Sequence, residues 1–386
     1  SGQWWEQNVQ RALANNSVNY KEKPDVGTFM REWLSLYDSK SGERGIYNSM
    51  SAKRTVERIN GRYRDGSGDY IRRRDPREDF GTNPCSEIIL RSREFCNLSE
   101  VVIRRNDTRE SLKAKVKHAT ILGTFQSTLT EFKYLSREWK RNCDEERLLG
   151  VSLTGIMDNP LTNGSKGKLD ELLEELRDVA YETNKEWAEK LGIPTSAAIT
   201  CVKPSGTVSQ LVDSASGIHA RHNPYYIRTV RADNKDPLCK LMQEMGFPNE
   251  PDVTKPDHTT VFSFPMKSPN GAVCRTDMTA LEQLNLWKTY ADSWCEHKPS
   301  VTITVKEQEW VDVASWVYEN FDSISGISFL PFSEHVYRQA PYQDCTEEEY
   351  KEALKTMPKN VDWAELSKYE SQDYTVASQE LACTAG

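Results

Sequence analysis

The stretch that decides the fold is AAITCVKPSGTVSQ, residues 197–210. Its first six residues are small or apolar and include Ile199 and Val202, which is typical of a strand buried on both faces. Residues 203–207 contain a proline and a glycine and predict a turn. A buried strand followed by a turn and a helix is the repeating unit of α/β proteins.

The same alternation continues on both sides of this stretch. Short apolar segments predict strands at 88–90, 101–103, 150–156, 261–264, 300–305 and 327–330. Longer amphipathic segments predict helices at 25–38, 108–132, 168–192, 236–246, 278–296, 309–320 and 346–356. This order predicts an α/β fold with a parallel sheet or barrel.

Composition excludes several classes of protein. The 386 residues include 50 basic and 58 acidic side chains, a net charge of -8, so the chain lacks the basic excess of a general nucleic-acid binder. The one dense basic run, Arg72-Arg73-Arg74, is followed by acidic residues, and we interpret it as a solvated loop. No apolar run approaches the length of a membrane span and no signal-peptide pattern occurs, so we expect no membrane partner.

The nine cysteines are an odd number scattered along the chain, which does not fit a secreted disulfide framework. No pair has CxxC spacing and no Cys/His cluster has zinc spacing, so we expect no metal bound by the protein. A reducing, cytoplasmic location fits best. We expect most of these thiols to be small buried side chains.

The first candidate chemical motif is GTNPCSEI, residues 81–88. In extended backbone Asn83, Cys85 and Glu87 would project to one face. A thiol between an amide and a carboxylate combines a reactive group with a general base. The alternative is a buried cysteine at the start of a strand. Cys96 follows closely in the sequence and could return near Cys85, or simply belong to the core.

The second candidate motif is the turn at 203–209. A strand, a turn of small residues and a helix present free backbone N–H groups and hydroxyls, which suits a phosphate. The residues assigned to phosphate binding are Pro204, Ser205, Gly206, Thr207, Val208 and Ser209. The alternative is an ordinary connection between strand and helix.

Two further features are weaker. The small residues of DSASGIH, 213–219, would let a large ligand approach the backbone, although a lone histidine is more often a satisfied hydrogen bonder. The residues assigned to cofactor contact are Ser214, Ser216, Gly217 and His219. Cys383 lies in a small-residue tail, where a mobile thiol could exchange with a disulfide.

Taken together, these segments resemble one family. NPCSEI at 83–88 and FCNLSEVV at 95–102 resemble the radical-cysteine loop of ribonucleotide reductases. The segments 200–231, 324–343 and 379–386 resemble the monomeric, adenosylcobalamin-dependent (class II) ribonucleoside-triphosphate reductases. The tyrosine pair in PYYIRTVR matches the class II sequence pattern rather than the paired-tyrosine motif through which class I enzymes receive the radical. The C-terminal residues CTAG do not match a glycyl-radical motif.

The resemblance implies roles for the marked residues. Cys85 would become a thiyl radical that abstracts the ribose 3′-hydrogen, and Asn83 and Glu87 would hold and deprotonate the 3′-hydroxyl. Cys96 would be one of two cysteines that reduce the 2′-carbon. Cys383 would be the first cysteine of a tail pair that receives electrons from a thioredoxin-like reductant.

The resemblance also implies that about half of the family's length is absent. We therefore expect residues 1–369 to be the C-terminal half of a ten-stranded α/β barrel, with a finger loop at about 81–98, completed by a partner chain with the N-terminal half. Residues 370–386 are expected to be a flexible redox tail. Two alternatives stay open: a non-catalytic remnant that binds nucleotide or cobalamin, and a fragment of a class I large subunit.

Overall fold

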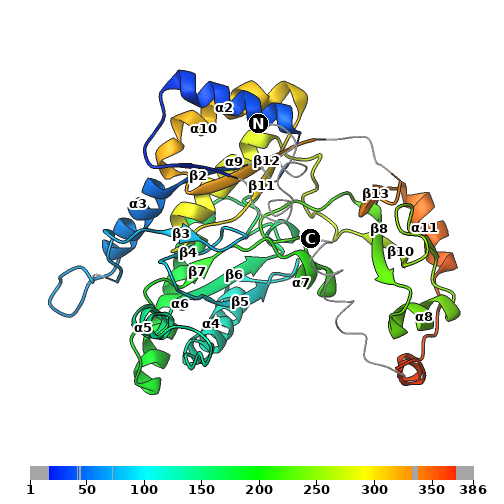
Figure 1. Cartoon of the computed structure of the whole chain (residues 1–386), viewed down its shortest axis with the longest axis horizontal. Coiled ribbons are helices and arrows are strands. Elements are labelled where there is room, and N and C mark those ends of the chain that lie inside the picture. Colours follow the sequence, from blue (N-terminus) through cyan, green and yellow to red (C-terminus); the bar gives the residue numbers. More distant parts are fainter. Residues whose placement is uncertain (1–16, 41, 43–44, 72, 333–337, 371–386) are drawn as a thin grey trace. The chain divides into compact units, whose positions relative to one another are not determined.

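The computed structural model describes residues 17–40, 42, 45–71, 73–332 and 338–370 (Figure 1). The chain divides into two compact units. Among the described residues, the first unit runs to Ala220 and adds Gly271–Val273 and Asp277–Phe332; the second holds Arg221–Asn270, Cys274–Thr276 and residues 338–370. Cys85 and Cys96 both lie in the first unit, so that unit carries the candidate chemistry.

Two sheets form the centre of the first unit. One has the order β1-β2-β12-β11, with bounds Val18–Tyr20, Gly45–Asn48, Gly326–Pro331 and Thr302–Val305. Within it β1 is parallel to β2 and β11 is parallel to β12, whereas β2 and β12 are antiparallel. The other sheet is entirely parallel and has the order β5 (Asn97–Val102), β6 (Leu149–Thr154) and β7 (Thr200–Cys201).

The two sheets meet at Val202, directly after β7. The Val202 amide donates to the carbonyl of Lys298 (3.3 Å), and the Ser300 amide donates to the carbonyl of Val202 (2.8 Å). This bridge is parallel, so β7 lies beside the segment that leads into β11. The strands β5, β6, β7, β11 and β12 therefore run in one direction.

Helices cover these strands. α4 (Arg109–Gln126) packs on β5 and β6 and against α6 (Leu169–Leu191), as Figure 1 shows. All six residues of β6 are buried, which explains why its sequence is apolar or small throughout. Gly192 ends α6 with a φ of 65°, a left-handed conformation that glycine adopts without strain.

The remaining helices of the first unit complete this cover. Their bounds are α2 (Val26–Ser39), α3 (Ser49–Asn60), α5 (Arg137–Glu146), α7 (Gly206–Leu211), α9 (Ala280–Ser293) and α10 (Trp310–Glu319). α9 packs against α6 and β11, and α10 packs against α2 and α9. The helix predicted at 108–132 ends at Gln126, and α3 and α5 were not predicted.

A two-stranded hairpin carries the first candidate motif. Its strands are β3 (Gly81–Thr82) and β4 (Ile89–Leu90), which pair antiparallel. The loop between them contains Cys85. Ile89 is fully buried and packs in a small cluster with Phe80, so the base of the hairpin is anchored in the core.

The second unit is built on an antiparallel sheet. Its order is β13-β8-β10-β9, with bounds Tyr342–Asp344, Tyr225–Asp233, Thr259–Lys267 and Asn249–Pro251. The helices α8 (Pro237–Glu244) and α11 (Glu347–Thr356) belong to the same unit. The sequence did not predict this antiparallel sheet, because only part of β10 was recognised as a strand.

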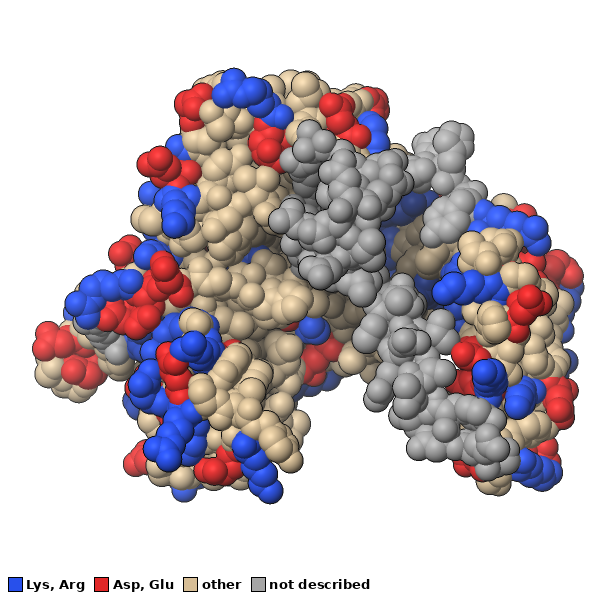
Figure 2. All heavy atoms as spheres, viewed as in Figure 1, with Lys and Arg blue, Asp and Glu red and all other residues tan. Residues whose placement is uncertain are grey.

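The α/β prediction is confirmed, and the half-barrel with its partner stays a prediction. No helix in the described residues is long and apolar enough to cross a membrane. On the face seen in Figure 2, basic and acidic side chains lie intermixed over the described residues.

Candidate active site

The loop that carries Cys85 is a tight turn. Ser86 has a left-handed φ of 66°, and its amide donates to the carbonyl of Asn83 (2.9 Å). The Asn83 side-chain oxygen accepts from the amide of Ile88 (3.0 Å), which closes the loop. The expectation that residues 83–87 are extended and share a face is therefore wrong, because the backbone reverses at Ser86.

Cys85 and Glu87 nevertheless meet, through a residue from another element. The Cys85 thiol is exposed, whereas Glu87 is fully buried. The ammonium of Lys203, just after β7, lies 3.7 Å from Cys85 Sγ and 3.3 Å from Glu87 Oε1. The loop and the strand end thus build one centre with a thiol, a carboxylate and an amine.

One oxygen of this centre is left without a partner. Among the described residues, Glu87 Oε2 is buried and accepts no hydrogen bond. A buried acceptor without a donor is costly, and such atoms in native proteins often await a ligand. The orphan oxygen therefore points to a donor, such as a hydroxyl group, that is supplied from outside the chain.

The segment before β11 holds the loop from the other side. Lys298 donates from its amide to the carbonyl of Glu87 (3.2 Å) and from Nζ to Ser86 Oγ (3.0 Å). Ser300 Oγ donates to the carbonyl of Cys85. Gly326 leaves the required room, because a Cβ there would lie 2.6 Å from Lys298 Nζ. Burial lowers the pKa of Lys298 to about 7, although the charge of Glu87 acts in the opposite direction and raises it.

Cys96 lies near the buried carboxylate of Glu87. It is half-buried, and Gly150 gives it space, because a Cβ on that glycine would be 3.1 Å from Cys96 Sγ. Burial holds the pKa of Cys96 well above its usual value, and the charge of Glu87 acts in the same direction. Cys96 is therefore kept as a neutral thiol near the centre.

Fewer residues of the phosphate turn are accessible to a ligand than the sequence suggested. Ser205 and Ser209 are buried, and their hydroxyls are used within the protein. Ser205 Oγ donates to Glu100 (3.0 Å), and Ser209 Oγ donates to the carbonyls of Ser205 and Gly206. Gly206, Thr207 and Val208 are exposed, and a Cβ on Gly206 would meet nothing within 4 Å. This exposed part of the turn, together with the half-buried Pro204, can reach a ligand.

Three of the four residues assigned to cofactor contact divide into two kinds; the fourth, Ser216, is half-buried, and its carbonyl accepts from the His219 amide (2.9 Å). His219 uses both ring nitrogens, since Nδ1 lies 3.1 Å from the Ser216 carbonyl and Nε2 accepts from the Thr302 amide (3.1 Å). Gly217 packs so closely that a Cβ would lie 2.4 Å from the Lys203 carbonyl. These two residues do not fit as cofactor contacts. Ser214 does offer a buried hydroxyl that has no partner among the described residues.

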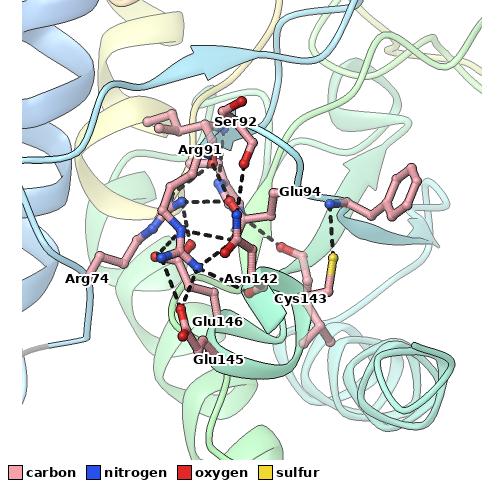
Figure 3. A network of polar contacts seen from close by, with 12 residues as sticks. Arg74, Arg91, Ser92, Glu94, Asn142, Cys143, Glu145 and Glu146 are labelled. Atoms are coloured by element: carbon pink, nitrogen blue, oxygen red, sulfur yellow. Dashed lines mark hydrogen bonds and ion pairs between the residues drawn. The ribbon is translucent and has the colours of Figure 1, made fainter. Parts of the chain in front are cut away.

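The base of the Cys85 hairpin contains a buried network of charges (Figure 3). Arg74 donates to Glu146 (2.7 Å) and to the carbonyl of Ile89 (3.0 Å), and it lies 3.5 Å from Glu94. Arg73 is likewise buried and forms an ion pair with Glu296. The interpretation of the arginine run as a solvated loop is therefore wrong for Arg73 and Arg74. Arg72 lies outside the described residues.

Other cysteines follow the sequence prediction in part. Five are buried: Cys143, Cys201, Cys239, Cys274 and Cys295. Cys383 and the tail at 371–386 lie outside the described residues.

Lys203 and Lys298 were not assigned to the site beforehand. Lys203 could have been noticed, because it is the basic residue between a buried strand and the turn.

Comparison with known proteins identifies relatives of this chain. The chain is 31% identical to an adenosylcobalamin-dependent ribonucleoside-triphosphate reductase of Euglena gracilis, over 77% of this chain and 40% of that protein. It is 27% identical to the enzyme of the same name from Lactobacillus gasseri, over 91% of this chain and 49% of that protein. No family model matches the chain.

Solved structures agree on the fold. The crystal structure of a B-12 dependent (class II) ribonucleotide reductase superposes with a TM-score of 0.75 and 22% identity, over 95% of this chain and 54% of that one. The class Id ribonucleotide reductase alpha subunit of Actinobacillus ureae gives a TM-score of 0.52 at 13% identity. The chain spans about half the length of the curated relatives it matches. Over that half it is homologous to the adenosylcobalamin-dependent, class II ribonucleotide reductases.

Proposed function

We propose that this chain carries the reacting cysteine of an adenosylcobalamin-dependent ribonucleoside-triphosphate reductase, which converts ribonucleotides to 2′-deoxyribonucleotides. The observation that carries the proposal is the centre at Lys203. There an exposed thiol, Cys85, lies beside a buried carboxylate, Glu87, whose Oε2 has no partner among the described residues. This arrangement leaves one reactive sulfur and one proton acceptor for a ligand.

Each of the three loop residues has a distinct task in this reaction. The Cys85 sulfur, as a thiyl radical, takes the hydrogen atom from the ribose 3′-carbon and later returns it. Glu87 Oε2 accepts the proton of the 3′-hydroxyl. The side-chain oxygen of Asn83 is already bonded to the Ile88 amide, which leaves its NH₂ group to donate to the same hydroxyl.

The electrons follow a separate route. Cys96, kept neutral by burial, supplies one of the two thiols that reduce the 2′-carbon. The second thiol of that pair comes from the missing half. Cys383 on the tail would restore the pair by disulfide exchange and receive electrons from a thioredoxin-like reductant.

The exposed part of the phosphate turn places the substrate. Backbone N–H groups in the first turn of a helix lack intrahelical acceptors, so those near Gly206 and Thr207 can face the triphosphate. The open space beside Gly206 would be taken by the phosphate. A valine at 206 would fill that space and raise the KM for the ribonucleotide. Ser205 and Ser209 would shape the turn rather than touch the ligand, because their hydroxyls are used internally.

Adenosylcobalamin supplies the radical when it is bound. Of the residues assigned to it, Ser214 fits, because its buried hydroxyl lacks a partner among the described residues. Gly217 and His219 do not fit, because internal contacts occupy them. This chain's own contribution is to keep Cys85 exposed and its loop fixed through Lys298 and Ser300.

A partner chain with the missing half would complete the enzyme. Among the described strands, β5 pairs only with β6 and β1 pairs only with β2, so each leaves one edge unpaired. Unpaired edges invite further strands. The partial coverage of the relatives supports the same proposal. We place the enzyme in the reducing cytoplasm.

The test is a reconstituted assay. The chain is mixed with a partner that supplies the N-terminal half, a ribonucleoside triphosphate, adenosylcobalamin and a dithiol, and the deoxyribonucleotide is measured by chromatography. We expect product only when the cofactor and both chains are present. Product without cobalamin would point to a class I fragment, and nucleotide binding without any product would point to a non-catalytic remnant.

A further inference from the structure

We propose that Lys203 is a positioning residue of the Cys85 centre: its ammonium compensates the charge of Glu87 and determines which oxygen faces the substrate. The geometry carries this inference. Lys203 Nζ donates to Glu87 Oε1 at 3.3 Å and lies 3.7 Å from Cys85 Sγ. It therefore contacts both groups that would react.

The backbone of Lys203 is fixed, so its side chain starts from a defined point. The Lys203 amide donates to Ser152 Oγ (2.9 Å) in β6. Its carbonyl packs against Gly217, where even a Cβ would come within 2.4 Å. Lys203 also directly precedes the phosphate turn. The residue thus links the turn that would place the substrate with the base that would act on it.

The charge on Lys203 persists despite its partial burial. Burial alone would lower the pKa of Lys203, but Glu87 and Cys85 together raise it above the ordinary value. Lys203 thus places a cation 3.3 Å from a fully buried carboxylate oxygen, and removing it would take away the charge that this contact compensates.

The other basic group near Glu87 cannot take this role. Lys298 reaches the loop from the segment before β11, but its Nζ donates to Ser86 Oγ rather than to the carboxylate. Burial lowers the pKa of Lys298 to about 7, so at neutral pH it carries only part of its charge. The thiols of Cys96 and Cys201 also interact with Glu87, and neither is a cation. Lys203 is the cation that the described residues bring into hydrogen-bond contact with the Glu87 carboxylate.

The contact also selects one oxygen. Because Oε1 is engaged by Lys203, Oε2 is the atom left without a partner among the described residues. Lys203 therefore aims the carboxylate as well as compensating its charge. This positioning role rests on the proposed function, whereas the contact with Cys85 can be tested without it.

The first test is the pH profile of kcat/KM in the reconstituted enzyme. Lys203→Met removes the charge at similar length, and Lys203→Arg keeps it. The matched control is Lys115→Met, because Lys115 is similarly exposed and pairs with the mostly buried Asp107. We expect Lys203→Met to move the acid limb up by about one pH unit or more, and Lys203→Arg to restore most of it. An unshifted acid limb in Lys203→Met overturns the proposal.

The second test needs no reductase activity. The rate at which iodoacetamide alkylates Cys85 in the chain itself is measured at pH 7.5 by peptide mass spectrometry. An adjacent ammonium favours the reactive thiolate. We therefore expect several-fold slower alkylation in Lys203→Met, with Lys203→Arg and Lys115→Met close to the unmodified chain.

The two tests separate two failures. If Lys203→Met is alkylated more slowly but the unmodified chain never forms deoxyribonucleotide, the proposed function is refuted and the contact between Lys203 and Cys85 stands. Unchanged alkylation in Lys203→Met, in a chain with an unchanged thermal midpoint, contradicts the contact itself. If Lys203→Met fails to fold, Lys203→Gln is measured in the same way and decides.

Discussion

The tip and the base of the Cys85 hairpin differ in how far their charged groups are buried and paired. At the base, Arg74 and Glu94 have fully buried side chains, and Arg74 donates to Glu146 at 2.7 Å (Figure 3). At the tip, Cys85 is exposed, Lys203 is partly exposed, and Glu87 keeps an oxygen without a partner among the described residues. At the base each buried charge has a partner of opposite sign, whereas at the tip one carboxylate oxygen has no partner among the described residues.

This difference separates stability from chemistry. A buried ion pair holds its neighbours in place because breaking it leaves an uncompensated charge in the interior. An open acceptor stabilises nothing in the free chain, and it becomes useful only when a ligand completes it. Changes at the tip should therefore alter activity at little cost in stability, and changes at the base should do the reverse.

The largest effect is expected at the tip. Cys85→Ser should reduce deoxyribonucleotide formation to less than a few per cent, because a hydroxyl does not readily form the required radical. The thermal midpoint should stay unchanged, since the exposed side chain makes few contacts and serine has a similar size. The measurement is turnover in the reconstituted enzyme beside a melting curve. Residual turnover above a few per cent would falsify the assignment of Cys85.

A change at the base should act on stability instead. Arg74→Met leaves Arg91 as the remaining cation beside Glu146 and Glu94, and it should cost about 3 kcal/mol in the free energy of unfolding. The measurement is urea unfolding. Arg77→Met is the matched control, because Arg77 pairs with Asp75 on the surface and its loss should leave the stability nearly unchanged. Equal losses in the two variants would remove the distinction between base and tip.

These two regions also mark how far the sequence could predict the molecule. The alternation of strands and helices around 197–210 predicts the parallel α/β sheet, because apolar runs between turns identify buried strands without knowledge of tertiary contacts. The local sequence around Cys85 instead predicted an extended segment, and only the family resemblance predicted a loop there. The meeting of Cys85 with Lys203 does not follow from the sequence, because that contact joins residues more than a hundred positions apart.

Where the prediction failed, a long-range contact was again the cause. Arg73 and Arg74 look like surface residues in a charged loop, but their carboxylate partners Glu296 and Glu146 come from distant segments. The left-handed turn at Ser86 is invisible in a sequence where no glycine marks it. The long strand β8 alternates too weakly in hydrophobicity to be recognised without its partner β10.

A smaller effect concerns pH and the base alone. Burial and the neighbouring Glu146 raise the pKa of Glu94 in the folded chain. The unfolded chain therefore loses this proton first, so the stability that the site contributes falls as pH rises through the window between the ordinary and the raised value. Glu94→Gln cannot ionise. Its stability relative to the unmodified chain should improve by about 1–3 kcal/mol between pH 5 and pH 8.

The measurement for this variant is urea unfolding at several pH values in that range. Comparing the two proteins at each pH cancels the contribution of Lys298, whose lowered pKa adds stability only as pH rises above about 7. Parallel stability curves for the two proteins would show that Glu94 does not hold a proton in the fold.

The smallest effect is expected at the phosphate turn, where open and closed hydroxyls lie two residues apart. Thr207 is exposed, and Ser209 is buried with its hydroxyl donating to the carbonyl of Gly206 (3.1 Å). Thr207→Ala should lower kcat/KM for the ribonucleotide. The fall should correspond to about 1–2 kcal/mol of lost transition-state stabilisation, as expected for one hydrogen bond to a charged group, and Thr207→Ser should restore kcat/KM. Ser209→Ala should lower the melting temperature and leave KM unchanged, because its hydroxyl serves the backbone. If Ser209→Ala raises KM as much as Thr207→Ala does, the turn as a whole supports the site and neither hydroxyl meets the phosphate.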